Sequence, residues 1–275
     1  AVDLSGNQIN VSGNFYPYNG QAISLAIFYP AGAGIESAAI KYESQISADS
    51  NGNFSFCFSP GFSFESGYYT ALLQIDGSNS VLQNFMYLSA ADIHNLIYQI
   101  NNCQNTSQMA QIIDSNIDIL SVPDSYNMVQ NKTAVYNTLI KKSFNDLEEI
   151  KKAFNESIVL ALVNQAATPW EIEELIARYS DILIIPNDFN NVQNKEFVYN
   201  SLIGKSFNNI QDVNTALSNS VLLALINETI SRGELEQLVL SNSAILQIDF
   251  RYYNSIPSNY RAQVWIKILP RNYNS

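Results

Sequence analysis

Histidine and cysteine are nearly missing from this sequence. In 275 residues there is one histidine, His94, and there are two cysteines, Cys57 and Cys103. A Ser/His/Asp triad or a histidine-rich zinc site would depend on His94 alone, and His94 lies in a predicted helix without a companion motif. Two cysteines cannot build a disulfide framework, and we expect these two, which fall in different predicted domains, to remain unpaired. The sequence therefore predicts no metal site and no cofactor.

Charged residues are also scarce, at 14% of the chain, and Asp and Glu outnumber Lys and Arg by 25 to 14. The net charge of −11 repels phosphate, so we expect no nucleic-acid partner and no binding to anionic membranes. Runs of about 18 apolar residues are missing too, so we expect no membrane insertion. Asn, Ser, Gln and Thr must cover most of the surface, a composition common in bacterial extracellular modules.

A secretion signal is missing as well. The N-terminus, Ala1–Leu4, has neither a basic segment nor an apolar one. The chain is therefore either cytoplasmic or a mature or excised part of a larger protein, and we favour the second interpretation. As partners we therefore expect neighbouring modules of a larger chain.

Apolar residues, in contrast, make up 47% of the chain, which is enough for a sizeable core in one large or two ordinary domains. From about residue 8 to residue 88 they alternate with a period of two, as at Ile23, Leu25 and Ile27. Turn signals separate these short segments. Alternating strands at this spacing predict an antiparallel β-sandwich of the Ig or fibronectin type over residues 1–89.

One turn in this region has two interpretations. The segment Asp49-Ser50-Asn51-Gly52-Asn53 lies between two predicted strands. Its Asn-Gly pair favours a β-hairpin, because a tight turn needs positive φ angles. Its oxygen-bearing side chains would also suit a calcium loop, but the glutamate that closes an EF-type loop is missing. We therefore expect the hairpin.

From Ser89 onward the period changes to 3.6, and the sequence repeats. Asn194–Ile203 is a second copy of Asn131–Ile140, 63 positions later, and the capping boxes that begin at Thr168 and Ser231 have the same spacing. Each copy is too short to bury its own apolar face, so stacked copies must share a core. Residues 90–275 are therefore predicted to form an all-α domain of three roughly 63-residue, three-helix repeats.

Each repeat is expected to contain three helices. A short apolar segment in an extended conformation is expected to join the second helix to the third. The predicted ranges are 91–103, 146–164 and 209–227 for the first helix, 107–116, 169–179 and 232–242 for the second, and 132–141, 195–205 and, after a short insertion, 260–269 for the third.

Three motifs in this region resemble known helical repeats. They are Asn-Lys-x-x-Val-Tyr-x-x-Leu at Asn131 and Asn194, Lys-Ser-Phe-Asn at Lys142 and Lys205, and Ala-Phe-Asn-Glu-Ser-Ile from Ala153. The units resemble repeats of large secreted, multimodular proteins of low-GC Gram-positive bacteria. There, such repeats lie beside Ig-like or fibronectin-like sandwiches and sometimes beside polysaccharide-degrading or S-layer-anchoring modules. The resemblance implies an extracellular accessory role, and its structural motifs carry over no site residue.

Aromatic residues near turns are the candidate binding residues. Exposed rings stack on sugar faces and anchor protein interfaces, although rings near turns also fold back onto the edge of a core. Acidic residues at helix starts, such as Glu171, are explained by the helix dipole rather than by a glycosidase pair. The candidate ligand-binding residues are Phe15, Tyr16, Tyr18, Phe62, Phe64 and Trp170.

Taken together, these features predict a non-catalytic module pair of a secreted bacterial cell-surface protein. It would act as a spacer, assembly or adhesion unit, with a polysaccharide or another surface protein as its partner. The alternative is a carbohydrate-binding accessory module of a polysaccharide-degrading enzyme, which exposed aromatic rows on the sandwich would favour. We do not expect the chain to be an enzyme itself.

Overall fold

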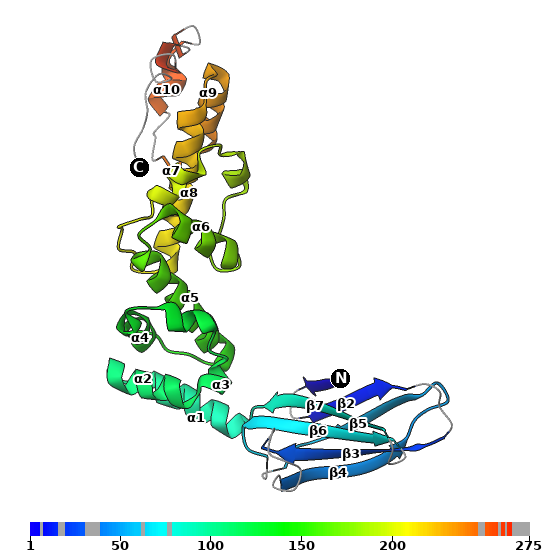
Figure 1. The fold of residues 1–275 in the computed structure, drawn as a ribbon. Helices are drawn as coiled ribbons and strands as arrows, with labels where there is room; N and C mark the ends of the chain where they lie inside the picture. The colour runs from blue at the N-terminus through cyan, green and yellow to red at the C-terminus, as the bar shows by residue number, and fades with distance from the viewer. Residues whose placement is uncertain are drawn as a thin grey trace. The chain divides into compact units, whose positions relative to one another are not determined.

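The computed structural model describes residues 1–5, 8–15, 20–30, 39–61, 64–75, 79–246, 251–257, 260–261 and 263–265. Within these residues an antiparallel β region is followed by a series of helices, as the sequence predicts (Figure 1). The chain divides into two compact units, one of residues 1–122 with 143–150 and one of residues 123–142 with 151–275. The first unit thus holds the described strands together with the first helices.

The strands of the first unit form two antiparallel sheets. One has the order β1-β2-β5 and the other the order β4-β3-β6-β7. The alternating apolar residues point into one shared core, where Ile9, Val11 and Leu25 are at most 1% exposed. The strand bounds are β1 Val2–Ser5, β2 Gln8–Asn14, β3 Ala22–Tyr29, β4 Ala39–Ser47, β5 Asn53–Phe58, β6 Gly67–Ile75 and β7 Asn79–Tyr87.

The turn from Asp49 to Asn53 is not the predicted β-hairpin. Strand β4 pairs with β3, and β5 pairs with β2, so this turn carries the chain from one sheet to the other. The Oδ1 atom of Asp49 accepts hydrogen bonds from the backbone nitrogens of Asn51 and Asn53, both at 2.8 Å. These bonds, that from Asn53 first, lower the pKa of Asp49. Gly52 has a φ of 81°, and a Cβ there would lie 2.2 Å from the carbonyl oxygen of Phe15.

Helix α1 (Ala90–Asn101) begins directly after β7, at the position where the sequence pattern changes. The Oγ atom of Ser89 accepts a hydrogen bond from the backbone nitrogen of Asp92 at 3.1 Å, which caps the helix. The carboxylate of Asp92 accepts bonds from the Ser89 hydroxyl and from the backbone nitrogen of Ser66. Hydrogen bonding by Ser66 and then Ser89 lowers the pKa of Asp92.

The remaining helices lie close to their predicted positions, although the predicted helix 195–205 ends at Asn200. The connector expected to be extended at residues 119–120 lies instead in a short α-helix, and the helix at 251–255 was not predicted either. Short 3-10 helices, which the sequence did not indicate, follow two of the expected connectors. The bounds are α2 Thr106–Ser115, α3 Ile117–Leu120, η1 Asp124–Met128, α4 Lys132–Ile140, α5 Leu147–Gln165, α6 Pro169–Arg178, η2 Asn187–Asn191, α7 Lys195–Asn200, α8 Ile210–Glu228, α9 Arg232–Ser241 and α10 Arg251–Ser255.

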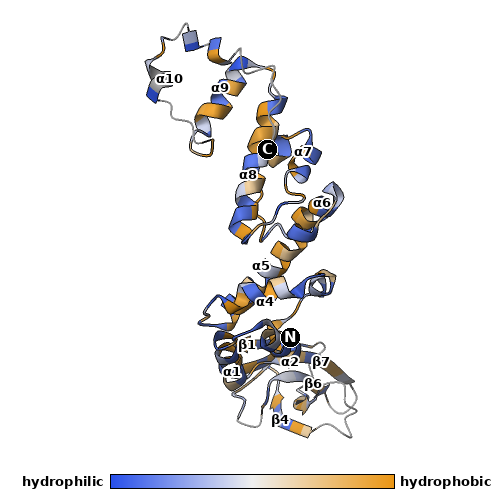
Figure 2. Ribbon diagram, turned by 90° about the vertical axis from the view of Figure 1, so that its left-hand side faces the viewer, coloured by the Kyte–Doolittle hydropathy of each residue, from blue (hydrophilic) through white to orange (hydrophobic). Residues whose placement is uncertain are grey.

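The spacing of 63 positions recurs in the elements themselves. Helices α5 and α8 begin and end 63 positions apart, and so do α6 and α9 and the pair η1 and η2. Val135 of α4 and Val198 of α7 are both 0% exposed. Hydrophobic and hydrophilic residues both occur along α5 and α8 (Figure 2), and residues 157–163 of α5 are all buried, as expected of a helix that other segments surround. Among the described helices, none is long and apolar enough to span a bilayer.

The same spacing recurs in hydrogen bonds between side chains and distant backbone. The Nδ2 atom of Asn101 donates to the carbonyl oxygen of Phe144 at 2.8 Å, and the Phe144 nitrogen donates back to Oδ1 at 2.9 Å. Asn164 and Phe207 form the same two bonds, both at 2.9 Å. We call each arrangement an asparagine clamp. Each clamp ties a helix end to the segment that precedes the next long helix, and both residues of a clamp belong to the same compact unit.

The C-terminal part of the second unit has a small core of its own. It contains Leu235, Val239, Tyr253 and Trp265. The Trp265 indole nitrogen donates to the Tyr253 hydroxyl at 2.6 Å, and that hydroxyl donates to the carboxylate of Glu236 at 2.7 Å. Of the predicted helix 260–269, residues 260–261 and 263–265 are helical, and the remainder lies outside the described residues.

Candidate functional site

The aromatic residues predicted to bind a ligand have different environments. The ring of Phe15 is half-buried and packs against the sandwich core. Phe64 is 6% exposed and stacks on Tyr69, with ring centroids 5.2 Å apart, so it offers little surface to a ligand. Trp170, the second residue of α6, is 66% exposed. Tyr16, Tyr18 and Phe62 lie outside the described residues.

Phe15 and Phe64 belong to the first compact unit and Trp170 to the second. His94 is exposed on α1. Both cysteines are free, Cys57 at the surface and Cys103 in the interior. Within the described residues, His, Cys, Asp and Glu side chains form no group that could hold a metal ion.

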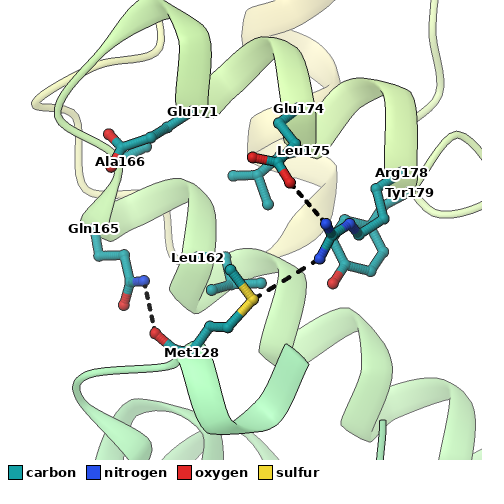
Figure 3. Close-up of a pocket in the computed structure, with 9 residues that line it drawn as sticks. All are labelled: Met128, Leu162, Gln165, Ala166, Glu171, Glu174, Leu175, Arg178 and Tyr179. Atoms are coloured by element: carbon teal, nitrogen blue, oxygen red, sulfur yellow. Dashed lines mark hydrogen bonds and ion pairs between the residues drawn. The ribbon is translucent and has the colours of Figure 1, made fainter. Parts of the chain in front are cut away.

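The second unit contains a small cavity of about 80 Å³ between η1, α5 and α6 (Figure 3). Apolar side chains form much of its wall, and polar groups of α6 lie at its edge. The lining residues are Met128, Leu162, Gln165, Ala166, Glu171, Glu174, Leu175, Arg178 and Tyr179. The sequence does not indicate this cavity, because Met128 is 50 positions from Arg178 and no motif links the two residues.

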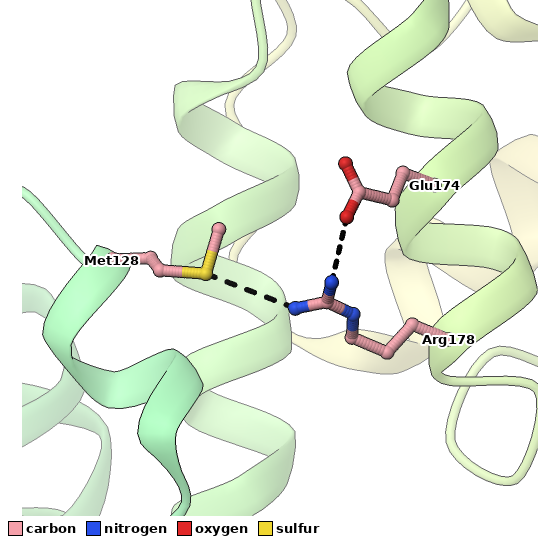
Figure 4. Close-up of polar contacts among 3 residues, drawn as sticks. All are labelled: Met128, Glu174 and Arg178. Carbon is pink, nitrogen blue, oxygen red and sulfur yellow. Dashed lines mark hydrogen bonds and ion pairs between the residues drawn. The ribbon is translucent and has the colours of Figure 1, made fainter.

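Arg178 connects two sides of the cavity (Figure 4). Its Nη2 atom lies 2.7 Å from Oε1 of Glu174, one helical turn earlier, and its Nη1 atom lies 3.8 Å from the sulfur of Met128. Gln165 holds η1 in place, because its Nε2 atom donates to the carbonyl oxygen of Met128 at 3.1 Å. Its Oε1 atom accepts from the backbone nitrogen of Gln130 at 3.1 Å. Arg178 thus links side chains of η1 and α6, and Gln165 links α5 to the backbone at the end of η1.

Glu171 is committed to the start of α6. Its Oε2 atom accepts hydrogen bonds from the backbone nitrogens of Ala167 at 2.7 Å and Thr168 at 2.9 Å, and from the Thr168 hydroxyl at 3.1 Å. These bonds, that from Ala167 first, lower the pKa of Glu171. An exposed carboxylate that is held ionised as a helix cap is a poor proton donor at neutral pH.

One polar group of this cavity, the Tyr179 hydroxyl, is buried and has no hydrogen-bond partner within the described residues. It can donate one hydrogen bond to a small polar group, while Leu162, Leu175 and Met128 supply apolar contacts. A cavity measured in this way needs about 10–15 Å³ to hold one water molecule, so this one has room for a few waters or a small polar group.

A wider groove of about 540 Å³ lies between the end of α4, α5 and the start of α8. Its volume is in the range of ordinary ligand sites. Asn209 and Asn208 bond with Asp212 at the start of α8, so part of this wall is also used for capping. Its lining is rich in amides, without an aromatic ring: Asn137, Thr138, Lys141, Lys142, Glu156, Ser157, Leu160, Asn208, Asn209, Ile210 and Gln211.

Comparison of the chain with models of protein families, with curated proteins and with solved structures finds no match.

Proposed function

We propose that this chain is a non-catalytic module pair of a secreted bacterial cell-surface protein, acting as a spacer, assembly or adhesion unit. The observation that carries this proposal is that recurring polar side chains bond to the backbone and hold it in place. The asparagine clamps of Asn101 and Asn164 recur 63 positions apart, and each bonds to the backbone of its own compact unit. Polar groups that recur to hold backbone in place support a structural role.

We further propose that the helical region consists of three repeats. Helices α2, α6 and α9 each have 10 residues and begin 63 positions apart. Each has a capping side chain that accepts a bond from the backbone three residues later, namely Asn105, Thr168 and Ser231. The backbone nitrogens of Gln130 and Gln193 also donate to equivalent side chains, Gln165 and Glu228. Recurring bonds of this kind are typical of stacked repeats.

The sandwich is proposed to be of the Ig and fibronectin type. Two observations support this assignment, the division of its strands between two antiparallel sheets and the environment of Tyr69. Tyr69 lies near the start of the sixth strand, is 0% exposed, and donates its hydroxyl to the carbonyl oxygen of Glu65 at 2.8 Å. A tyrosine that bonds backwards to the backbone at this corner is a feature of such sandwiches. Burial raises the pKa of Tyr69 to about 12, so it stays neutral.

A deletion tests the proposal. Removing residues 145–207 joins Phe144 to Asn208, which places α8 directly after the clamp that Asn101 makes. Equivalent core positions of α5 and α8 carry apolar residues, as at Ile150 and Val213. We expect this shortened chain to fold and to melt cooperatively by circular dichroism, because a spacer built of repeats tolerates the loss of one unit.

The matched control removes residues 145–200 and joins Phe144 to Ser201, which breaks the phase of the repeat. This control should melt at a lower temperature than the variant lacking residues 145–207, or aggregate. If the deletion of 145–207 behaves no better than the deletion of 145–200, the helical region is not a set of interchangeable units and the proposed spacer role fails.

The exposure of Trp170 favours a second candidate, a carbohydrate-binding accessory module. A ring that is 66% exposed on a rigid helix is able to stack on a sugar face. A glycan array with the full chain and with Trp170→Ala tests this candidate. Binding that Trp170→Ala weakens at least tenfold supports it, and an array without binding contradicts it.

A further inference from the structure

Strand β7 lies at one edge of the four-stranded sheet, where β1 of the other sheet approaches it without pairing. Among the described residues it pairs with β6 alone, so the backbone groups on its other side have no strand partner. Its nine residues include no charge, no proline and no glycine. Residues 80–84 are exposed, with Val81 at 57% and Leu82 at 59%. A long edge of this kind is a template for another strand.

The other edges of the two sheets differ from β7. Strand β1 has four residues, one of which is Asp3. Strand β4 carries Lys41 and Glu43, charges that discourage pairing at an edge. Strand β5 has six residues, and its large hydrophobic side chains face the core rather than solvent. Strand β7 is thus the edge that combines length, lack of charge and exposed apolar side chains.

We propose that two copies of this chain associate through β7, which pairs antiparallel with β7 of the second copy and continues the sheet across a two-fold axis. This inference deepens the proposed assembly role, on which it rests, by naming the partner. A two-fold interface requires the same patch to be self-complementary. A register centred on Gln83 pairs all nine residues of each strand.

In this register the side chains match on both faces. Val81 and Phe85 lie on the face that β6 turns toward the core, because they pair with Leu73 and Tyr69. Each Val81 then faces Phe85 of the second copy, an aliphatic–aromatic pair of the kind that stabilises sheets. On the other face, Leu82 lies opposite Asn84. Pairing therefore covers the two most exposed apolar side chains of the strand.

Pairing along β7 adds no contact between like charges. Each chain carries a net charge of −11, which opposes association of two copies at long range, so a dimer requires an interface that is itself free of charge. Strand β7 carries no charge. A strongly basic or acidic partner strand would find no complementary charge on β7, whereas β7 itself is an uncharged, alternating strand.

Sedimentation equilibrium of the full chain tests the proposal, and we expect a concentration-dependent dimer. Gln83 is exposed and lies opposite its own copy in the proposed register. Gln83→Lys therefore places two positive charges against each other, and Gln83→Glu places two negative ones. Each variant should raise the dimer Kd at least tenfold, and an equimolar mixture of both should restore dimers. Gln45→Lys, at an exposed position of the β4 edge, is the control and should leave Kd within about twofold.

Three results would overturn the proposal: a wild-type chain that stays monomeric at about 200 μM, dimers that persist in both Gln83 variants, or a mixture that does not restore them. Melting curves establish that each variant is folded, and either Gln83 variant is sufficient to test the loss of pairing. If the wild-type chain is monomeric and the variant lacking residues 145–207 still folds, the β7 pairing is overturned and the module proposal stands. If the wild-type chain is a dimer and that variant unfolds, the module proposal fails and the β7 pairing stands.

Discussion

Replacing Asn164 by alanine tests how much an asparagine clamp contributes to stability. The substitution removes two hydrogen bonds, one to the carbonyl oxygen and one from the nitrogen of Phe207, both 2.9 Å long. A hydrogen bond contributes about 0.5–1.5 kcal/mol net, so two contribute about 1–3 kcal/mol. Because Asn164 is exposed, water can replace both bonds in the variant. We therefore expect a loss in the lower half of this range, about 1–2 kcal/mol.

Urea unfolding followed by tryptophan fluorescence measures this loss, since Trp170 and Trp265 both belong to the compact unit that contains Asn164. Asn164→Asp keeps the acceptor and loses the donor, so it should cost about half as much. Asn190→Ala, at an exposed position of η2, should change stability by less than about 0.5 kcal/mol. A loss for Asn164→Ala that equals the loss for Asn190→Ala would refute the assignment of the clamp.

Three further substitutions have clear expected outcomes. Phe154→Ala should cost about 3–5 kcal/mol in urea unfolding, because the ring is 1% exposed and lies 5.3 Å from the ring of Tyr126; a loss below about 1 kcal/mol would contradict its place in the core. Gly52→Ala should lower the melting temperature more than Gly20→Ala, because both have positive φ angles but a Cβ meets backbone only at Gly52; equal shifts would contradict the close approach of Phe15. The folded-state pKa of Asp92 is lowered, so its contribution to stability is present above the unfolded-state pKa of about 3.9 and is lost as pH falls below it. Asp92→Asn should therefore lower the melting temperature at pH 7 and reduce the decline of the melting temperature as the pH falls. If the melting temperature declines equally in acid for the variant and the wild type, Asp92 contributes nothing to the pH dependence of stability.

Local chemistry explains why many helix boundaries could be predicted from the sequence. The segment from Thr168 to Glu171 specifies a capping box with proline at the first helical position, and α6 begins at Pro169. The alternation in β3 and β5 likewise indicates which side chains face a core. Alternation does not indicate which strands pair, which is why the turn at Asp49 was expected to be a hairpin although it joins the two sheets.

The features that the sequence does not indicate depend on residues far apart in the chain. The asparagine clamp joins positions 43 residues apart, and the recurrence of Asn101 at Asn164 was its only sequence signal. The cavity at Arg178 depends on η1, a 3-10 helix too short to show a hydrophobic period. The burial of Phe64 depends on the ring of Tyr69, which belongs to a different element. Pairwise packing of this kind leaves no local pattern.

Amide hydrogen exchange measured by NMR tests the repeated architecture most directly. The amides of Phe144 and Phe207 donate to equivalent asparagines, and those of Gln130 and Gln193 donate to equivalent side chains. If the chain is built of repeats, the protection factors within each pair should agree within about tenfold, a difference of about 1.4 kcal/mol in opening free energy. If one amide of each pair is protected while the other exchanges at the rate of an unstructured peptide, the helical region is not a set of repeats.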